Sequence, residues 1–505
     1  MGPSRLVLVG CLTLAAKALA AQCPDGTPPP CGPPPPRVSP RSVAVLYFVN
    51  RSADSSAIYL ADGLTDEIIQ RLTRIERLEV KSRTAVERYR LSASPPDSLG
   101  RALRVAYLVS GAVQRSGRRL RVSVELLRAR TGLVSWAAHF DRHDADMLDI
   151  QTAIADTVAQ EVAGRLLPGE RAVLTERPTR DPEAWDRFLR GNFLLARRNA
   201  DDGRLAIRDF ETAVRLDPSF PAAHARIALT YGVALDHGWP GFDTRASIQT
   251  GLAESARALE LDSTLADAWT ARGYILRYAN PRTYAGVRAA FAHAVALAPR
   301  DAEAHLQFGW ALEHLGDRPG ALTTLYRAIE LDPERAITRS TLAWVLFNAR
   351  RVPEVIAQMD TSIALQPPTA STLALRAWAR LLTGDTAGAR TDLQAIRSED
   401  LPALTGSALA SLAARQGDSA TARATADRLA AELPAAPARL TWRASLVALT
   451  YAATGQAERA VDLLERIEPQ GLSAWWITSH PGCDSIRGDP RFASFVATLA
   501  PPGSQ

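Results

Sequence analysis

A short stretch of the chain, residues 139–146, carries the side chains of a candidate metal site: His139, His143, Asp144 and Asp146. Imidazole nitrogens and carboxylate oxygens are common protein ligands of zinc. The four residues match no zinc-ligand spacing, and two histidines beside loop carboxylates occur by chance. We therefore predict no metal site here.

Three acids, Asp62, Asp66 and Glu67, are the candidates for acid–base catalysis because they share one helical spacing. They lie near a predicted helix start, where the helix dipole favours negative charge. Near the other end of the chain, His480 and Cys483 alone form neither a metal site nor an activated nucleophile. The sequence also lacks a Gly-rich phosphate loop, a Gly-x-Ser-x-Gly elbow and a kinase motif set. We predict that the chain is not an enzyme and takes no cofactor.

A column of aromatic residues is the strongest candidate for binding. Trp310, Trp344 and Trp378 follow one another at intervals of 34 residues, and Tyr274 stands in the equivalent place one unit earlier. Rigid aromatic rings bury a large apolar area and stack on Arg or Pro. Such a column is a plausible surface for a peptide, provided that the chain folds so that the rings line up.

The elements that would align these rings are pairs of amphipathic helices. Residues 302–333 form two such helices, split at residues 315–320 and ended by Leu331-Asp332-Pro333. Leu297-Ala298-Pro299 and Leu365-Gln366-Pro367 repeat this ending at a spacing of 34. Small residues let paired helices approach closely, large ones fill the space between them, and Pro ends the second helix. One such pair cannot bury its apolar face alone, so the pairs must stack.

The pattern resembles the tetratricopeptide repeat, a unit of about 34 residues. Its large and small positions are matched by Phe308, Gly309, Leu312, Ala321, Leu325, Ala328 and Pro333. The resemblance extends over residues 181–470 and implies about eight repeats in an all-α superhelix. It also implies that the ninth position of each repeat, which the aromatic column occupies, faces a concave groove.

Two interpretations of the column stay open. The rings could line a partner-binding groove, or they could pack between adjacent first helices as core, as Trp often does. The candidate groove residues are Tyr274, Arg277, Tyr278, Trp310, His314, Trp344, Phe347, Asn348 and Trp378. The Lys, Arg and Asn clamp by which some members of the family hold a terminal carboxylate is not matched, because this column is aromatic.

Residues 42–165 have a different pattern, with short apolar runs and period-two alternation. Strands are predicted at 43–48, 78–80, 107–113, 120–127 and 133–140, and helices at 58–75, 99–103 and 147–167. Hairpin-like turns at 114–117 and 130–132 join the last three strands. This is a compact α/β domain with a small mixed sheet.

Several motifs of this domain have a familiar order. Ser42-Val43-Ala44-Val45-Leu46, residues 61–68 (Ala-Asp-Gly-Leu-Thr-Asp-Glu-Ile), Val109-Ser110-Gly111-Ala112-Val113 and residues 131–136 (Thr-Gly-Leu-Val-Ser-Trp) resemble the TolB-amino-terminal-like domain. That family often precedes tetratricopeptide repeats in bacterial regulators and class III adenylate cyclases, with an effector domain in front. The resemblance implies the sensory or interaction half of such a protein.

The first 41 residues indicate export. Arg5, the apolar run 6–16 and the small residues 18–20 are typical of a signal peptide ending near residue 21. Leu8-Val9-Gly10-Cys11 is a rival lipobox that would anchor Cys11 to lipid. Residues 22–41 are dominated by Pro and predict an extended tether. Cys23 and Cys31 could close a small disulfide loop there in an oxidising compartment, or stay free.

Charge and composition exclude several functional classes. The 505 residues carry a net charge of +5, and Arg alternates with Asp and Glu along the helices instead of clustering. This is typical of solvated helix faces and argues against nucleic-acid binding. No window after the leader is apolar enough to span a membrane.

The sequence therefore predicts a signal peptide (1–21), a Pro-rich tether (22–41), an α/β domain (42–165), a linker (166–180), the repeats (181–470) and a C-terminal cap and tail (471–505). The predicted function is a non-enzymatic scaffold or sensor module of a bacterial cell envelope, periplasmic or envelope-associated, that binds a partner protein or peptide. The alternative is a regulatory subunit whose α/β domain senses a small ligand and signals to a separate enzyme. A hydrolase is the weakest of the three hypotheses.

Overall fold

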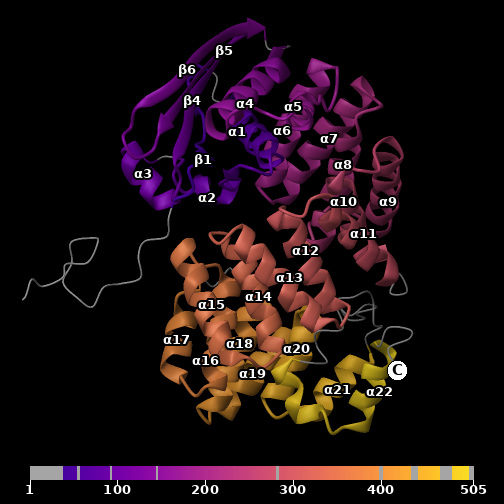
Figure 1. The fold of residues 1–505 in the computed structure, drawn as a ribbon. Helices are drawn as coiled ribbons and strands as arrows, with labels where there is room; N and C mark the ends of the chain where they lie inside the picture. The colour runs from indigo at the N-terminus through magenta and orange to yellow at the C-terminus, as the bar shows by residue number, and fades with distance from the viewer. Residues whose placement is uncertain are drawn as a thin grey trace, which may run out of the picture.

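The computed structural model describes residues 38–53, 57–90, 92, 94–143, 146–279, 284–396, 402–433, 442–466 and 480–499. The predicted signal peptide, the tether, Cys11, Cys23 and Cys31 lie outside these ranges. Figure 1 shows a sheet-containing domain at one end, followed by helical pairs that curve away from it and turn back beneath it. The fold is an α/β domain with a small mixed sheet, followed by an all-α tetratricopeptide-repeat array, as the sequence predicts.

The sheet has the order β3-β1-β4-β5-β6 among the described residues, and the short β2 also pairs with β4. β1 (Ser42–Val45) lies parallel to β3 (Glu79–Val80) and to β4 (Tyr107–Ser116), and β2 (Val49–Asn50) is parallel to β4. β5 (Arg119–Arg128) and β6 (Val134–His143) continue the sheet in antiparallel fashion. Gly117 and Gly132, both with positive φ, lie in the two connecting turns, which confirms both predicted hairpins.

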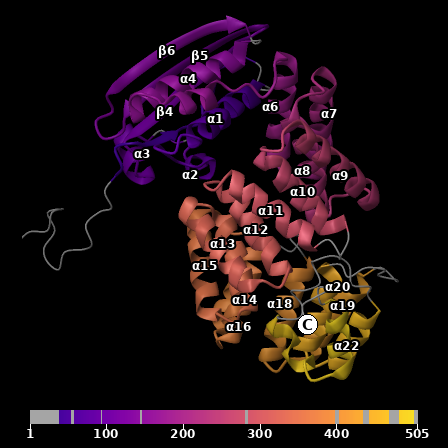
Figure 2. The same ribbon diagram turned by 45° about the vertical axis from the view of Figure 1, so that its right-hand side comes forward.

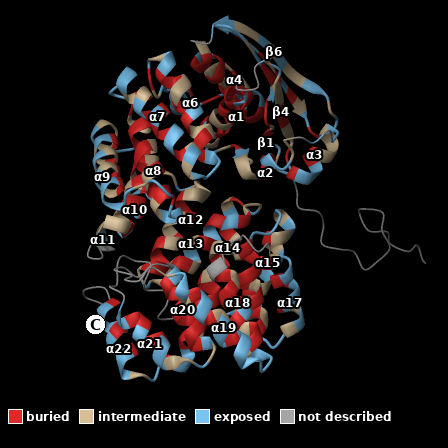
Figure 3. Ribbon diagram, turned by 180° about the vertical axis from the view of Figure 1, so that it is seen from behind, coloured by how far each residue is buried: buried red, intermediate tan, exposed pale blue. Residues whose placement is uncertain are grey.

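Helices cover one face of this sheet. α1 (Ile58–Thr73) and α4 (Met147–Ala163) contact each other and the strands, whereas α3 (Pro96–Leu103) lies beside β4. The five-residue α2 (Arg83–Glu87), which the sequence analysis missed, follows β3. On β5 the inward residues Leu120, Val122, Val124 and Leu126 are fully buried, and the residues between them face solvent. The outer face of β5 and β6 is accordingly exposed (Figure 3).

The domain joins the repeats through a continuous core. α1 packs against α6 (Pro182–Ala196) so closely that a Cβ on Gly63 would lie 2.9 Å from the Leu189 side chain. The Tyr59 hydroxyl donates a 2.8 Å hydrogen bond to Asp186 of α6. Within the predicted linker, residues 168–175 form a further helix, α5 (Pro168–Thr175), whose Leu174 is buried. The sheet, the α1/α4 layer and the first repeat are therefore stacked as three layers (Figure 2).

The helical half consists of eight consecutive pairs within the described ranges. The pairs are α6 with α7 (Ala200–Leu216), α8 (Pro221–His237) with α9 (Thr244–Leu261), α10 (Ala266–Ala279) with α11 (Tyr284–Leu297), α12 (Ala302–His314) with α13 (Arg318–Leu331), α14 (Ala336–Asn348) with α15 (Val352–Leu365), α16 (Ala370–Leu382) with α17 (Thr386–Gln394), α18 (Pro402–Arg415) with α19 (Ser419–Ala431), and α20 (Trp442–Ala453) with α21 (Ala457–Glu465).

Small and large residues lock the two helices of a pair together, as predicted. In the fourth pair a Cβ on Gly309 would lie only 2.6 Å from Leu325. Gly309 is therefore a position of close helix approach, and Leu325, Ala321 and Ala328 are fully buried opposite it. Gly273 is crowded in the same way by Phe291 in the preceding pair.

The turn between the two helices of a pair contains a left-handed residue in several repeats. In the second repeat Gly238 and Gly241 have positive φ, and in four further repeats glycine stands at one common position, with φ near 80° at Gly316, Gly384, Gly417 and Gly455. At the same position the first and fifth repeats carry arginine, with φ 54° at Arg198 and 61° at Arg350. A side chain in this conformation costs about 1–2 kcal/mol, so these two turns are strained.

The described part of the chain ends in the 3₁₀ segment η5 (Pro481–Ile486) and the helix α22 (Pro490–Leu499), which pack on α20 and α21. Cys483, Ile486, Phe492 and Phe495 are buried there. The α/β domain also touches the array far along the sequence, because Arg300 donates to the carbonyl oxygen of Leu78 and Arg88 pairs with Glu334. None of the described helices is both long enough and apolar enough to cross a membrane.

Candidate partner-binding site

The predicted groove residues all lie on the first helices α10, α12, α14 and α16, but most are covered. Tyr274, Phe347 and Trp378 are buried, and so are the polar side chains of Arg277, His314 and Asn348. Tyr278, Trp310 and Trp344 are half-buried. The accessible part of the aromatic column is thus limited to α10, α12 and α14, and whether it binds a partner stays a prediction.

The rings do not form one continuous stack. Trp344 and Trp378 meet edge to face with centroids 6.0 Å apart, and Phe347 stacks on Trp378 at 6.2 Å. Further toward the N-terminus, Tyr274 instead contacts Phe291 of its own repeat at 6.3 Å, and Trp310 contacts His314 at 4.4 Å. Tyr274, Phe347 and Trp378 are therefore packed against other rings of the array, and both interpretations of the column stay predictions.

A polar cluster lies where α8 and α10 end, with Arg277 buried and Asp236 partly exposed. Asp236 accepts a 2.9 Å hydrogen bond from Arg277 Nη2 and another from the Tyr278 hydroxyl. Burial alone would raise the pKa of Asp236, but Arg277 and Tyr278 hold it below its ordinary value. The other terminal nitrogen of Arg277, Nη1, is buried and has no hydrogen-bond partner. An unsatisfied buried donor costs about 1–3 kcal/mol, more when it is charged.

A second polar cluster lies on α12 and α14. Glu313 is almost fully buried and accepts hydrogen bonds from Arg318 at 2.8 Å and from Asn348 Nδ2 at 3.1 Å. The Asn348 Oδ1 atom is buried without a donor. Nearby, His314 faces Trp310, Arg277 and Asp236, and burial lowers its pKa to about 4, so its imidazole is neutral at physiological pH.

The C-terminal end of the column is covered by the chain's own tail. His480 is buried, with its ring centroid 5.0 Å from Phe347 and 5.6 Å from Trp378. Four residues later, Asp484 is held by both terminal nitrogens of Arg350. The segment 480–486 thus runs from α20 across to α14 and covers the column from Phe347 onward.

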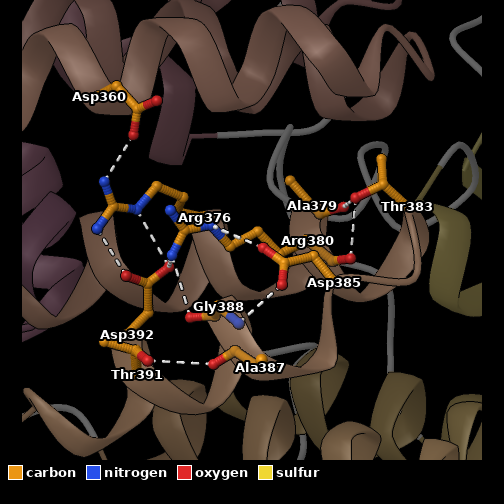
Figure 4. A network of polar contacts seen from close by, with 10 residues as sticks. All are labelled: Asp360, Arg376, Ala379, Arg380, Thr383, Asp385, Ala387, Gly388, Thr391 and Asp392. Carbon is orange, nitrogen blue, oxygen red and sulfur yellow. Dashed lines mark hydrogen bonds and ion pairs between the residues drawn. The ribbon is translucent and has the colours of Figure 1, made fainter.

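A network in the sixth repeat shows what a purely structural cluster looks like. Figure 4 shows Arg376 and Arg380 of α16 converging on Asp392 of α17, with Asp360 of α15 on the far side of Arg376. The shortest contacts, Arg376 to Asp392 and Arg376 to Asp360, are both 2.6 Å. No atom of these four side chains is among the buried atoms without a partner.

Of the other sequence candidates, the histidines of β6 are not gathered into a site in the described part of the chain, whereas Asp62 and Asp66 each pair with an arginine. His139 and His143 lie on the exposed strand β6, Asp144 is outside the described residues, and no group of three potential metal ligands occurs in the described part. In α1, Asp62 is bound by both terminal nitrogens of Arg90, and Asp66 pairs with Arg83 at 2.8 Å.

The sequence analysis missed Asp236, Glu313 and Arg350 and did not place His480 against the column. The sequence predicts a loop insertion at residues 236–241, whereas Asp236 lies in the last turn of α8. Glu313 is visible in the sequence only as an ordinary charge on an amphipathic helix. Arg350 carried one signal, because it occupies the turn position that is glycine in four other repeats.

Two comparisons with known sequences found similar proteins. Residues 39–157 match a family described as the second domain of HilA/YgeH-like transcriptional regulators. This description does not name the TolB-amino-terminal-like domain, so that resemblance stays a prediction. A relative from Rhizobium meliloti (strain 1021), named "Putative adenylate cyclase 3", is 29% identical over 232 residues. The match covers 46% of this chain and only 39% of that relative's length.

Two of the solved structures to which the chain is similar are repeat proteins. PilW, a type IV pilus biogenesis factor, is 19% identical with a TM-score of 0.36, covering 42% of this chain and 94% of its own. A tetratricopeptide-repeat protein from Parabacteroides merdae is 16% identical with a TM-score of 0.37, covering 53% and 98%. At these values no function transfers from either protein, and the assignment of the repeats rests on the helix pairs of this chain.

Proposed function

We propose that the chain is a non-enzymatic interaction scaffold that holds an extended segment of a partner protein along α10, α12 and α14. The observation that supports this proposal is a combination of residues on the first helices α10, α12 and α14. These helices carry the half-buried rings of Tyr278, Trp310 and Trp344 together with two buried polar atoms that have no hydrogen-bond partner, Arg277 Nη1 and Asn348 Oδ1.

An extended peptide can supply the hydrogen-bond partners that both atoms lack. Its backbone presents carbonyl acceptors and N–H donors in alternation. A carbonyl oxygen would accept from Arg277 Nη1, and an N–H would donate to Asn348 Oδ1. Small movements of the Trp310 and Trp344 rings would admit the backbone, and the rings would then cover apolar or Pro side chains of the ligand. Arg277 and Arg318 are each paired with a carboxylate, so the face is close to neutral and does not select a strongly charged ligand.

We propose further that the scaffold acts in the cell envelope. This part of the proposal rests on the signal-peptide pattern of residues 1–21 and on the Pro-rich tether that follows it. Secretion of a reporter enzyme fused after residue 41 tests it. Retention of the reporter in the cytoplasm would contradict it.

Capture from a cell-envelope extract tests the binding face. The bait is residues 22–505, compared with a Trp310→Ala/Trp344→Ala variant. Trp269→Ala is a matched control, because Trp269 is also half-buried on α10 but packs against His293 and is not part of the column. The proposal expects the double variant to remain helical and lose specific partners that the control retains. Equal capture by all three proteins contradicts it.

One observation favours the alternative function, in which the α/β domain senses a small ligand. A cluster of Tyr47, Asp62, Asp66, Arg83 and Arg90 lies at the carboxyl ends of the parallel strands β1 and β3, where ligands bind in open α/β sheets. Burial raises the pKa of Asp66 to about 6, with Arg83 opposing, and its Oδ1 is buried without a partner.

Saturable stabilisation of the full chain by a small molecule tests this second function. The melting temperature would be measured across a metabolite library with the wild type and with Asp66→Asn. A shift that the variant loses would support ligand sensing at this cluster. A library without any saturable shift, or a shift equal in both proteins, would contradict it.

A further inference from the structure

The C-terminal segment contacts the aromatic column in the way a bound peptide would. Its His480 ring packs on Phe347 and Trp378, and Asp484 receives two hydrogen bonds from Arg350. Ser485 donates a 2.9 Å hydrogen bond to the Ala452 carbonyl oxygen of α20. The His480 ring, the Asp484 carboxylate and the Ser485 hydroxyl thus contact three helix pairs between them: α14/α15, α16/α17 and α20/α21.

Arg350 provides an independent indication that this contact has a purpose beyond capping. Its backbone is left-handed at the turn position where four other repeats carry glycine. Glycine adopts this conformation without the steric cost that arginine meets. Arginine in turn supplies two hydrogen-bond donors in one plane, and these match the two oxygens of the Asp484 carboxylate.

We propose that Phe347, Trp378 and Arg350 form a peptide-binding subsite that the tail occupies until a competing partner displaces it. The partner segment carries an imidazole or aromatic ring followed four residues later by a carboxylate, as His480 and Asp484 do. This inference rests on the proposed function, because it extends the same binding face toward the C-terminus.

The tail's intramolecular position explains why the subsite is closed in the free protein. A tethered segment competes at a high effective concentration, so an external peptide binds weakly while the tail is docked. Gly482 lies against α20, because a Cβ added to it would lie 3.2 Å from the Cδ2 atom of Leu449. The backbone of the segment therefore lies directly on the helix it crosses.

A labelled synthetic peptide tests the subsite. The probe has the sequence of residues 479–488 with the change Cys483→Ser, and its binding is followed by fluorescence anisotropy. Full-length protein with His480→Ala and Asp484→Ala, which keeps the subsite but weakens the tail, is expected to bind the probe at least about tenfold more tightly than wild type. Adding Arg350→Gly to this variant should abolish binding. Adding Arg198→Gly, which relaxes the equivalent strained turn in the first repeat, should not.

A second measurement separates binding from folding. Arg350→Gly alone relaxes its turn, so its helical circular dichroism should match wild type, while tryptic cleavage after Arg487 becomes about tenfold faster than in Arg198→Gly. Unchanged cleavage would overturn the inference, as would a double-alanine variant that binds the probe no better than wild type. Loss of helical signal in Arg350→Gly would also overturn it, because the tail would then be core. Partner capture that depends on Trp310 and Trp344 can succeed in any of these cases, so the two proposals fail separately.

Discussion

The two ends of the aromatic column have the same residue types and different surroundings. On α10, α12 and α14, Tyr278, Trp310 and Trp344 are half-buried, and the same helices carry two buried polar atoms without hydrogen-bond partners. From Phe347 to Trp378 the rings are buried under His480. The spacing of aromatic residues along the chain is therefore not sufficient to define a binding surface. What covers each ring decides whether it packs or remains available.

The two polar clusters of the array also differ, in whether their buried atoms have hydrogen-bond partners. The Arg376–Asp392–Arg380 network has no buried atom without a partner, and it ties three helices together. In the Asp236–Arg277–Tyr278 cluster Arg277 is buried but Asp236 is partly exposed, and one charged nitrogen of Arg277 has no hydrogen-bond partner. Satisfied networks stabilise the repeats, whereas the unsatisfied atom indicates where a ligand would be held.

Truncation of a ring at each end of the column is expected to have the largest effect on the free energy of unfolding. Trp378→Ala removes a buried ring and leaves a cavity against Trp344 and Phe347, so it should lower the free energy of unfolding by about 4 kcal/mol. Trp310→Ala removes a half-exposed ring and should cost about half as much. Urea denaturation followed by circular dichroism measures both. Equal losses would mean that the two ends are packed alike.

Removal of the Asp392 carboxylate, which lies at the centre of the Arg376–Asp392–Arg380 network, should lower the free energy of unfolding nearly as much. Asp392→Ala leaves Arg376 and Arg380 without their shared partner, and we expect a loss of about 3 kcal/mol. Arg351→Ala, which breaks only an exposed pair with Glu354, should cost less than about 0.5 kcal/mol. The same urea titration gives both values. A small loss in Asp392→Ala would mean that the network contributes little to the repeat.

Acid should weaken the covered end of the column through His480. Burial lowers the pKa of His480 to about 3, while Asp484 opposes this shift and Arg350 and Arg487 add to it. The contribution of the neutral ring is complete above pH 6.5 and is lost as the pH falls toward 3, because the unfolded chain binds the proton first. Between pH 6.5 and 4.5 we expect wild type to lose about 2.5 kcal/mol more than His480→Gln. Parallel pH dependences in urea titrations of the two proteins would exclude this role.

The smallest effect on the free energy of unfolding is expected at the two strained turns, where substitution of Arg198 and of Arg350 by glycine should differ. Arg198→Gly should raise the free energy of unfolding by about 1 kcal/mol, since glycine relieves the left-handed strain. Arg350→Gly should change it by less than about 0.5 kcal/mol, because the same relief is offset by loss of the pair with Asp484. Thermal and urea unfolding of the two variants, side by side, measure the difference. An equal gain in both would show that the Asp484 pair contributes nothing.

Much of the fold could be predicted because local patterns determine it. The recurrence of Leu-x-Pro endings and of Gly309 with Leu325 predicts helix pairs, and period-two alternation predicts β5 with its buried face. The short helix α2 escaped prediction, since its five residues are too few to show a helical period.

The site was less predictable because it depends on contacts between distant segments. His480 reaches Trp378 across a hundred residues of chain, and Asp236 meets Arg277 only once two repeats have stacked. Neither contact has a local signature. Residue types alone could not distinguish the half-exposed Trp310 from the buried Trp378, because both occupy the same position of the repeat.

The most direct test of the binding face is site-specific photo-crosslinking in the intact envelope. A benzophenone amino acid would replace Trp310 or Trp344 on the column, and Trp269 as the control on the side of α10 that meets His293. The account predicts discrete cross-linked products from positions 310 and 344 and none from position 269. Products from position 269 alone, or an equal pattern from all three positions, would contradict the assignment of the partner to α10, α12 and α14.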